Sequence, residues 1–271
     1  MKKLFLFLPA LLLLVASCSR DGAPSKIYVL TDDDKGFGSD HGKMEAVNGD
    51  IEALADGAMY YNELGLNVTF NGCVPTVIHD TNLNLMIIDF GAECKDANNN
   101  NRTGKIIVTY DLPYWDSGSI HRITFDNYKY NGDRLAGYKV TENRGFNGNG
   151  KRYFSVIVAD TLYPAGSGDN FISYYSERET VWVTGYNTKG NTSDDVYEVN
   201  GSGSMKRANN QYCDFNILTT LLVSNDCKYV RSGVMQIIPK DGYARTIDYG
   251  SGDCNDDAKL DINGMLFDVK L

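Results

Sequence analysis

Proline and histidine are scarce in this chain, and the sequence motifs of catalysis are missing from it. The 271 residues include 6 prolines and 3 histidines. His41, His79 and His121 do not have the spacing of zinc ligands. Residues 89–91 (Asp-Phe-Gly) match the magnesium-binding triplet of protein kinases, but no glycine-rich phosphate loop accompanies them, and no Gly-x-Ser-x-Gly elbow marks a serine hydrolase. We therefore predict no catalytic site, no metal site and no cofactor.

Positive charge is also scarce. Lys and Arg number 26 against 35 Asp and Glu, which gives a net charge of −9. Nucleic acid binding requires clustered Lys and Arg that neutralise phosphates. An acidic chain of this composition is not expected to bind nucleic acid, and its charge favours solubility.

Long apolar runs are confined to the N-terminus. Lys2 and Lys3 precede an apolar stretch over residues 4–15, which is too short for a membrane span of roughly 20 residues. Small residues follow directly, so residues 1–17 have the composition of a cleavable signal peptide. Their end, Val-Ala-Ser before Cys18, resembles the bacterial lipobox. The resemblance implies that Cys18 carries acyl chains such as palmitate, which anchor the protein to a membrane, with residues 18–25 as a lipidated tether.

Glycine and tyrosine are abundant, at 27 and 18 residues, and they punctuate short runs of β-branched and aromatic residues. This texture is typical of antiparallel β proteins with many turns. Asn131-Gly132 and Asp241-Gly242 predict tight hairpins. We predict strands at residues 26–31, 67–71, 83–90, 105–111, 119–130, 135–141, 152–160, 179–186, 195–201, 211–218, 229–239, 243–249 and 265–271.

One helix is expected in the N-terminal part of the chain. Met44, Val47, Ile51 and Leu54 recur at helical spacing, which predicts a helix over residues 43–64 after an acidic, glycine-rich loop at 32–40. Residues 26–271 are therefore predicted to form a single domain that is mainly β. We expect an antiparallel meander that forms a large curved sheet, a sandwich or an open barrel, with this one N-terminal helix.

Two segments of the chain echo each other. Residues 88–94 read Ile-Asp-Phe-Gly-Ala-Glu-Cys and residues 247–254 read Ile-Asp-Tyr-Gly-Ser-Gly-Asp-Cys, with a glycine ten residues after each cysteine. The shared spacing favours two equivalent hairpins, at about residues 73–111 and 227–271, over a chance similarity.

Five cysteines remain besides Cys18. Disulfides are allowed in the oxidising cell envelope, and fifteen arrangements of two disulfides are conceivable. The repeated spacing of the two segments favours one of these arrangements, in which Cys213 has no disulfide partner. The alternative is that most of the five cysteines are buried free thiols. The selected pairs are Cys73–Cys94 and Cys227–Cys254.

Residues 96–100 and 253–257 carry oxygen-bearing side chains at the first, third and fifth positions, as calcium loops do. Neither segment has the glycine at position six or the glutamate at position twelve. Asx turns are therefore the favoured interpretation, with a weak calcium site as the alternative.

Several blocks of the chain resemble a group of predicted outer-membrane lipoproteins from Bacteroidetes-type bacteria. They are the lipobox, residues 88–94, 124–132, 182–185 and 247–254, and the similarity covers most of the chain after Cys18. The group is essentially of unknown function. The resemblance implies a β-rich fold and a lipid anchor on the periplasmic or the surface face of the outer membrane. Residues 160–162 (Asp-Thr-Leu) fit the O-glycosylation pattern of such bacteria, which makes Thr161 a candidate, with an ordinary strand-end threonine as the alternative.

The anchor, the sheet and the missing motifs favour a binding or structural role in the cell envelope without catalysis. The partners would be the membrane, through the lipid on Cys18, and an envelope protein or a glycan. One alternative is a carrier of an apolar ligand, which requires a large apolar cavity. Another is a glycan-binding or glycan-hydrolysing surface protein; hydrolysis requires two carboxyl groups about 5–10 Å apart in a cleft. Aromatic clusters suited to sugars or partners are found at residues 110–115, 128–130 and 174–175, with simple packing as the alternative.

Overall fold

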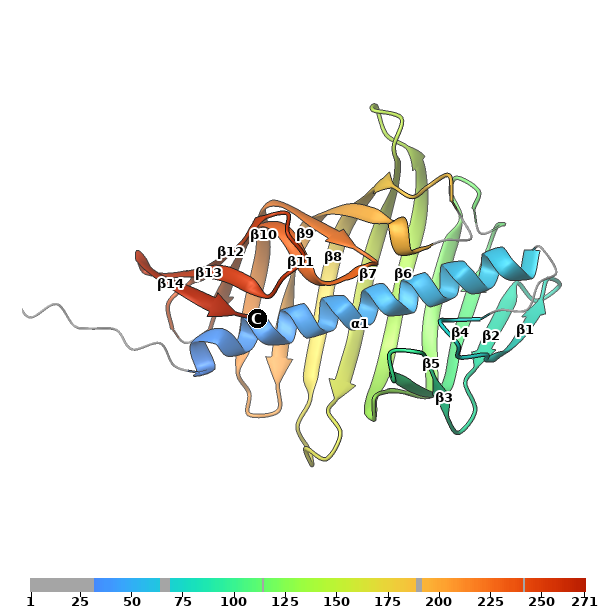
Figure 1. Ribbon diagram of the computed structural model, residues 1–271, viewed down its shortest axis with the longest axis horizontal. Coiled ribbons are helices and arrows are strands. Elements are labelled where there is room, and N and C mark those ends of the chain that lie inside the picture. Colours follow the sequence, from blue (N-terminus) through green and yellow to red (C-terminus); the bar gives the residue numbers. More distant parts are fainter. Residues whose placement is uncertain (1–31, 64–68, 114, 189–191, 241) are drawn as a thin grey trace, which may run out of the picture.

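The computed structural model describes residues 32–63, 69–113, 115–188, 192–240 and 242–271 (Figure 1). This part of the chain contains one long helix, one short 3₁₀ turn and a 14-stranded sheet. The elements are α1 (Asp32–Glu63), β1 (Thr76–Asp80), β2 (Leu85–Asp89), β3 (Cys94–Lys95), β4 (Asn101–Tyr110), β5 (Ile120–Tyr130), β6 (Asp133–Phe146), β7 (Arg152–Tyr163), β8 (Ile172–Thr184), η1 (Thr192–Asp194), β9 (Val196–Arg207), β10 (Tyr212–Ser224), β11 (Cys227–Pro239), β12 (Arg245–Ser251), β13 (Asp257–Ile262) and β14 (Met265–Lys270).

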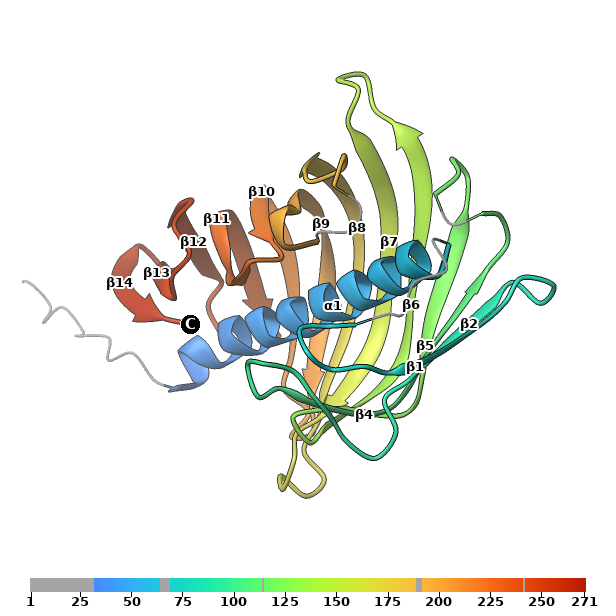
Figure 2. The same cartoon turned by 45° about the vertical axis from the view of Figure 1, so that its right-hand side comes forward.

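The strands form a single antiparallel meander. Each strand pairs with the next along the chain from β1 to β14, except that β3 lies off this path and pairs with β4. The sheet is strongly curved and does not close into a barrel (Figure 2). The predicted mainly β class, with one N-terminal helix, is therefore confirmed, and the curved open sheet is the form that it takes.

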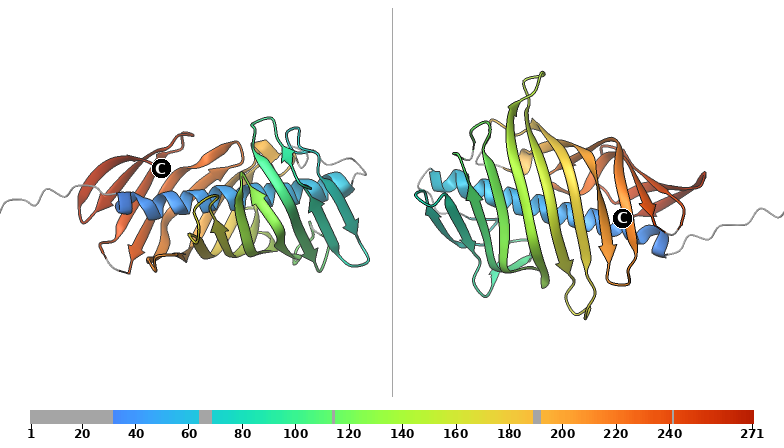
Figure 3. Two further views of the ribbon diagram at one scale, coloured as in Figure 1. Left: turned by 90° about the horizontal axis from the view of Figure 1, so that it is seen from below. Right: turned by 180° about the vertical axis from the view of Figure 1, so that it is seen from behind.

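The helix α1 lies across the concave face of the sheet and runs transverse to the strands (Figures 1 and 3). Its 32 residues correspond to a length of about 48 Å. One face of the helix is apolar and packs on the inward side chains of the strands. The buried residues of this face include Phe37, Met44, Val47, Ile51, Leu54, Ala55, Ala58 and Met59. Full burial of one such large apolar side chain contributes roughly 1.5–3 kcal/mol, so the sheet holds α1 firmly.

Alternation of buried and exposed residues positions the strands. In β5, His121 and Ile123 are buried, while Arg122 between them is exposed. Asn127, with a φ of 51°, lies where the pairing of β5 with β6 shifts register, and Tyr128 beyond it is again buried. The predicted hairpin at Asn131-Gly132 joins β5 to β6, and both residues have positive φ values of 51° and 88°. The Asp241-Gly242 hairpin lies between β11 and β12, which pair, but Asp241 is outside the described residues.

The prediction of a loop at residues 32–40 is wrong, because α1 already begins at Asp32. Glycine lowers helix propensity, but tertiary packing outweighs it here. A Cβ atom at Gly38 would lie 2.8 Å from the Ile247 side chain, so glycine allows the helix to approach the sheet closely. Phe37 is buried under the guanidinium group of Arg207, which lies 4.3 Å from its ring centroid.

Three strands were not predicted, namely β1, β3 and β13. The segment of β13, Asp-Ala-Lys-Leu-Asp-Ile, follows an acidic run that resembles a loop, and only its pairing with β12 and β14 makes it a strand. In the described part of the strand predicted at 67–71, Phe70 forms only an isolated bridge with Cys73. The predicted strand at 26–31 lies outside the described residues.

Candidate ligand-binding groove beside helix α1

A groove of about 1320 Å³ runs along α1 between the helix and the sheet. Beside the C-terminal half of α1, the wall of the groove is formed by side chains at paired positions on the neighbouring strands β5 to β9. Thr141 on β6 pairs with His121 on β5 and with Val156 on β7. Thr180 on β8 pairs with Phe154 on β7 and with Val199 on β9. Aromatic and charged side chains line this part, and they are Glu52, Asp56, Trp115, His121, Lys139, Phe154 and Tyr197.

Glu52 and Asp56 bring two carboxyl groups to one side of this groove. They are four residues apart on α1, so they lie on the same flank with Cβ atoms about 6 Å apart. Glu52 Oε2 lies 2.7 Å from Lys139 Nζ, and the Thr141 hydroxyl donates a hydrogen bond of 3.2 Å to Glu52 Oε1. The His121 Nε2 atom lies 3.9 Å from the same oxygen.

The environment gives the two carboxyl groups opposite protonation preferences. Burial is the largest influence on Glu52 and opposes its ionisation, but the charge of Lys139, the neighbouring His121 and the hydrogen bonds from Lys139 and Thr141 together lower the pKa of Glu52. Burial raises the pKa of Asp56 well above its usual range, and the neighbouring Glu52 carboxylate raises it further. Burial also lowers the pKa of His121 to about 4, so this imidazole is neutral at pH 7. The groove therefore brings a carboxyl group whose ionisation is favoured next to one whose ionisation is disfavoured.

Aromatic rings form the wall of the groove where β7 and β9 begin and β8 ends. Trp182 is buried at the centre, with its ring centroid 5.7 Å from Tyr197 in a stacked arrangement, 6.2 Å from Trp115 and 6.5 Å from Phe154. These three outer rings are half-buried and line the groove. The Trp182 Nε1 atom donates a hydrogen bond of 3.1 Å to Asp195 Oδ1, which fixes the central ring. The aromatic wall is therefore a supported, preformed surface.

Hydrogen bonds hold the individual members of this wall in place. Arg152 Nη1 and Asn143 Nδ2 donate hydrogen bonds of 2.8 and 3.1 Å to the carbonyl oxygen of Trp115. The Tyr197 hydroxyl donates a hydrogen bond of 3.3 Å to Asp195 Oδ2, and burial raises the pKa of Asp195 to about 7. Positions fixed in this way reduce the entropic cost of ordering side chains around a ligand.

The arrangement favours binding over hydrolysis. Glycosidases place two carboxyl groups on opposite sides of the scissile bond. Glu52 and Asp56 instead project from consecutive turns of one helix, and the oxygens of Glu52 already contact Lys139 and Thr141. Aromatic faces beside polar hydrogen-bonding groups are suited to ligands with both apolar and hydroxyl-bearing surfaces.

Ion pairs between α1 and the sheet fix the helix side of the groove. Four acidic residues along α1 each meet a basic residue that projects from the sheet. In helix order the pairs are Asp40–Arg207 on β9, Glu45–Arg178 on β8, Asp50–Arg102 on β4 and Glu52–Lys139 on β6. Because these pairs are buried or half-buried, they specify where α1 sits on the sheet more than they add net stability.

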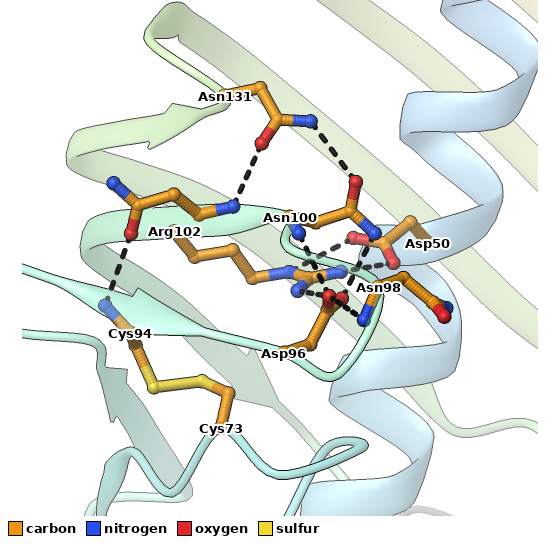
Figure 4. Close-up of polar contacts among 9 residues, drawn as sticks. Asp50, Cys73, Cys94, Asp96, Asn98, Asn100, Arg102 and Asn131 are labelled. Carbon is orange, nitrogen blue, oxygen red and sulfur yellow. Dashed lines mark hydrogen bonds and ion pairs between the residues drawn. A yellow bond between two sulfur atoms is a disulfide. The ribbon is translucent and has the colours of Figure 1, made fainter.

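Arg102 on β4 links the strand to α1 and to the loop that carries Asp96, as Figure 4 shows. Its Nη2 atom lies 2.6 Å from Asp50 Oδ1 on α1, and its Nη1 atom lies 3.0 Å from Asp96 Oδ2. Asp96 Oδ1 accepts hydrogen bonds of 2.9 and 2.8 Å from the backbone nitrogens of Asn98 and Asn100. The Asx turn predicted for residues 96–100 is thus confirmed, and it orients the carboxylate that holds Arg102.

Both predicted disulfides are present. Cys73 and Cys94 are bonded with a Cα separation of 5.2 Å, and Cys227 and Cys254 with one of 5.7 Å. Cys213, which the pairing left over, is a buried thiol, and burial raises its pKa to about 12. Each disulfide connects the beginning of a β-hairpin to the segment that follows the hairpin, as the repeated spacing predicted.

The echoing motifs form the same turn. Asp89 Oδ1 accepts a hydrogen bond of 2.9 Å from the Gly91 nitrogen, and Asp248 Oδ1 accepts one of 2.9 Å from the Gly250 nitrogen. Both glycines have positive φ values, of 65° and 86°. After the second cysteine the copies diverge, because β4 pairs directly with β2, whereas β13 comes between β12 and β14.

The remaining predicted residues have mixed outcomes. Cys18 lies outside the described residues. Thr161 is half-buried on β7, while its neighbours Asp160 and Leu162 are buried on the opposite, concave side. Among the predicted aromatic clusters, Trp115 lies in the groove and Tyr175 is exposed. Glycosylation of Thr161 therefore stays a prediction. Of the predicted aromatic clusters, the one at residues 110–115 contributes Trp115 to the groove.

The sequence did not single out Glu52, Asp56 or Tyr197. Two acids four residues apart in a helix are common on solvated surfaces. A signal for Glu52 was present on β6, where Lys139 occupies an inward-facing position. A buried lysine requires an acidic partner, and that partner is Glu52.

Within the described ranges, no helix is long and apolar enough to span a membrane. The same residues contain no group of three or more His, Cys, Asp or Glu side chains placed to hold a metal ion. The chain matches no family model, no curated protein and no solved structure.

Proposed function

We propose that this protein is a lipid-anchored protein of the outer membrane that binds a glycan in the groove beside α1. The observation that carries the proposal is the aromatic wall of Trp115, Phe154 and Tyr197 in the same groove as the Glu52–Asp56 pair. Aromatic rings pack against the apolar faces of sugar rings. The carboxyl groups can form hydrogen bonds with sugar hydroxyl groups, which both donate and accept hydrogen bonds.

The anchor is supported by the N-terminal sequence. Residues 1–17 have the composition of a signal peptide, and Cys18 is the residue that a lipobox would acylate. Residues 18–25, the predicted tether, lie between the proposed anchor and the domain that begins at residue 26. In this proposal the protein has no catalytic role and holds its ligand at the membrane surface.

A simple carrier, with an apolar ligand inside the curved sheet, has less support. The apolar side chains of α1, such as Met44 and Ile51, cover the concave face where such a ligand would lie. The helix thus occupies that space, and the groove alongside it is the space that is left for a ligand.

The test is a glycan array with purified protein that carries Cys18→Ser, which removes the acylation site. We expect binding to a limited set of glycans, and at least a tenfold loss in Trp115→Ala and in Asp56→Ala. The matched controls are Tyr175→Ala and Asp214→Ala, because both residues are exposed and lie outside the groove. Absence of binding to any glycan, or equal losses in controls and groove variants, would overturn the proposal.

A further inference from the structure

We propose that the glycan bound in this groove carries a positively charged amino group, which lies between the Glu52–Asp56 pair and the aromatic wall. This inference rests on the proposed glycan binding and names the chemical class of the glycan. It starts from the charges that line the groove. Among the described lining residues, Asp and Glu outnumber Lys and Arg by nine to five.

Most of the basic residues that line the groove are already paired with acidic ones. Four of the five form ion pairs, namely Lys43 with Asp133, Arg102 with Asp50 and Asp96, Lys139 with Glu52, and Arg178 with Glu45. The fifth, Lys228, is exposed, and its ammonium group lies 4.7 Å from the centroid of the Tyr229 ring. An anionic glycan beside the aromatic wall would therefore compete with Glu52 for Lys139, whereas a cationic glycan would meet an excess of carboxyl groups.

The excess of carboxyl groups is present beside the aromatic wall itself. The pKa of Asp56 is raised by burial first and then by Glu52, lowered by Lys139 and raised by Asp195, so the charges of all three groups act on it. Lys139 Nζ lies 2.7 Å from Glu52 Oε2, and the nearby His121 imidazole is neutral at pH 7. One ammonium group thus serves three carboxyl groups, and a second cation beside Asp56 would reduce the repulsion among them.

The aromatic wall is an independent indication of a cationic ligand. Ammonium groups are attracted to the faces of Trp, Tyr and Phe rings, and groups of such rings recognise cationic ligands. Trp115, Phe154 and Tyr197 supply three rings that are half-buried and line the groove. The attraction is stronger where the cation loses contact with water, as it does in a groove. The rings and the carboxyl groups therefore favour the same kind of ligand.

Asp195 makes the Tyr197 ring a better acceptor for a cation. Its Oδ2 atom accepts a hydrogen bond of 3.3 Å from the Tyr197 hydroxyl, and its Oδ1 atom accepts one of 3.1 Å from Nε1 of Trp182, which stacks on Tyr197. A carboxyl group that accepts such a bond polarises the ring and makes its face more negative. The pKa of the Tyr197 hydroxyl is raised by burial first and then by Asp56, so Asp56 lies close to this ring. The amino group therefore lies between Asp56 and Tyr197.

The test compares two oligosaccharides of equal length, the glucosamine tetramer and its fully N-acetylated counterpart. Binding to the Cys18→Ser protein is measured by isothermal titration calorimetry at pH 5.5, where the amines are protonated and the acetamides are neutral. We expect the glucosamine tetramer to bind about tenfold more tightly. Its affinity should fall severalfold when the salt concentration rises from 50 to 500 mM, because salt screens the attraction between charges, whereas the affinity of the N-acetylated tetramer should change little.

Asp56→Asn separates the charge of this side chain from its shape. The amide has nearly the same size and still forms hydrogen bonds, but it carries no negative charge, so the tenfold preference for the glucosamine tetramer should be lost. The matched control is Asp169→Asn, which removes the same charge from an exposed position outside the groove and should keep the preference.

The comparison of the two tetramers needs no variant, so the inference can be tested even if Asp56→Asn does not fold. Equal affinities of the Cys18→Ser protein for the two tetramers, or binding of neither, would overturn the inference, while the glycan array judges glycan binding separately. Equal loss of the preference in Asp56→Asn and Asp169→Asn would overturn it as well. If a tetralysine peptide binds as tightly as the glucosamine tetramer, the sugar contributes nothing, and the proposed glycan function fails together with the inference.

Discussion

Glu45 on α1 and Arg178 on β8 form a two-pronged ion pair inside the molecule. Arg178 Nη1 donates to Glu45 Oε2, and Arg178 Nη2 donates to Glu45 Oε1. The Tyr174 hydroxyl donates a further hydrogen bond of 2.6 Å to Glu45 Oε1. Burial opposes ionisation of Glu45, but the charge of Arg178, the neighbouring His41 and the hydrogen bonds from Arg178 and Tyr174 together lower the pKa of Glu45 to about 2. Because Glu45 also lines the groove, this contact positions the helix flank on which the binding proposal depends.

Removal of one member of this pair should destabilise the fold strongly. In Glu45→Ala, Arg178 would remain buried without its counter-charge, which costs about 3–5 kcal/mol. Urea unfolding measures the change. The control is Asp268→Ala, since its pair with Lys259 is exposed on both sides and should contribute less than about 1 kcal/mol. Equal effects of the two substitutions would contradict the assignment of Glu45 as a helix anchor.

Stability should depend on pH through Asp160. Burial raises the pKa of Asp160 to about 7, and its Oδ2 atom accepts a hydrogen bond of 3.0 Å from Asn48 on α1. Because the folded-state pKa lies above the usual 3.8, the protonated group adds stability below pH 3.8, and this contribution disappears as the pH rises through 7. Its full size is on the order of 4 kcal/mol.

Asp160→Asn isolates this contribution. The variant should be more stable than the parent protein at pH 8, and the difference should shrink as the pH falls toward 4, as measured by urea unfolding across the range. His41 and His121 also make stability depend on pH, because burial lowers their pKa values to about 4 and their neutral forms favour the fold at higher pH. Both histidines are present in the parent and in the variant, so their contributions cancel in the difference. A constant difference at all pH values would show that Asp160 does not titrate in this range.

The two disulfides should contribute comparable stability. They close loops with sequence separations of 21 and 27 residues, and loops of that length restrict the unfolded chain by about 3 kcal/mol each. Cys73→Ser/Cys94→Ser and Cys227→Ser/Cys254→Ser should each lower the free energy of unfolding by that amount, with the double replacement avoiding a lone thiol. Peptide mapping without reduction tests the pairing directly, and a mixed pairing that includes Cys213 would contradict it.

Local periodicity was sufficient for much of the fold. The alternation in β5 and the Asn131-Gly132 turn follow from short stretches of chain, and both are present in the structure. The first turns of α1 did not follow, since glycine-rich residues 36–38 are helical because they pack against Arg207 and Ile247, which are distant in sequence. The cysteine pairing was predictable because a repeated spacing, rather than local propensity, selected it.

The groove was much harder to predict than the fold. It brings Asp56 of α1 together with Trp115 and with Tyr197 of β9, and no pattern in the sequence links these positions. The transverse direction of α1 across the sheet determines which strands meet each turn of the helix. That direction depends on buried ion pairs such as Glu52–Lys139, whose partners are 87 residues apart in the numbering, from 52 to 139.

The most direct test of the account is to block the groove chemically. Ala53→Cys places a thiol on the α1 flank that lines the groove, whereas Ser155→Cys places one on an exposed position of β7 outside it. Each variant, in the Cys18→Ser background, is coupled to a bulky maleimide and applied to the best glycan from the array. We predict that the label at position 53 abolishes binding and that the label at position 155 leaves it unchanged. Full binding with position 53 labelled would show that the ligand lies elsewhere.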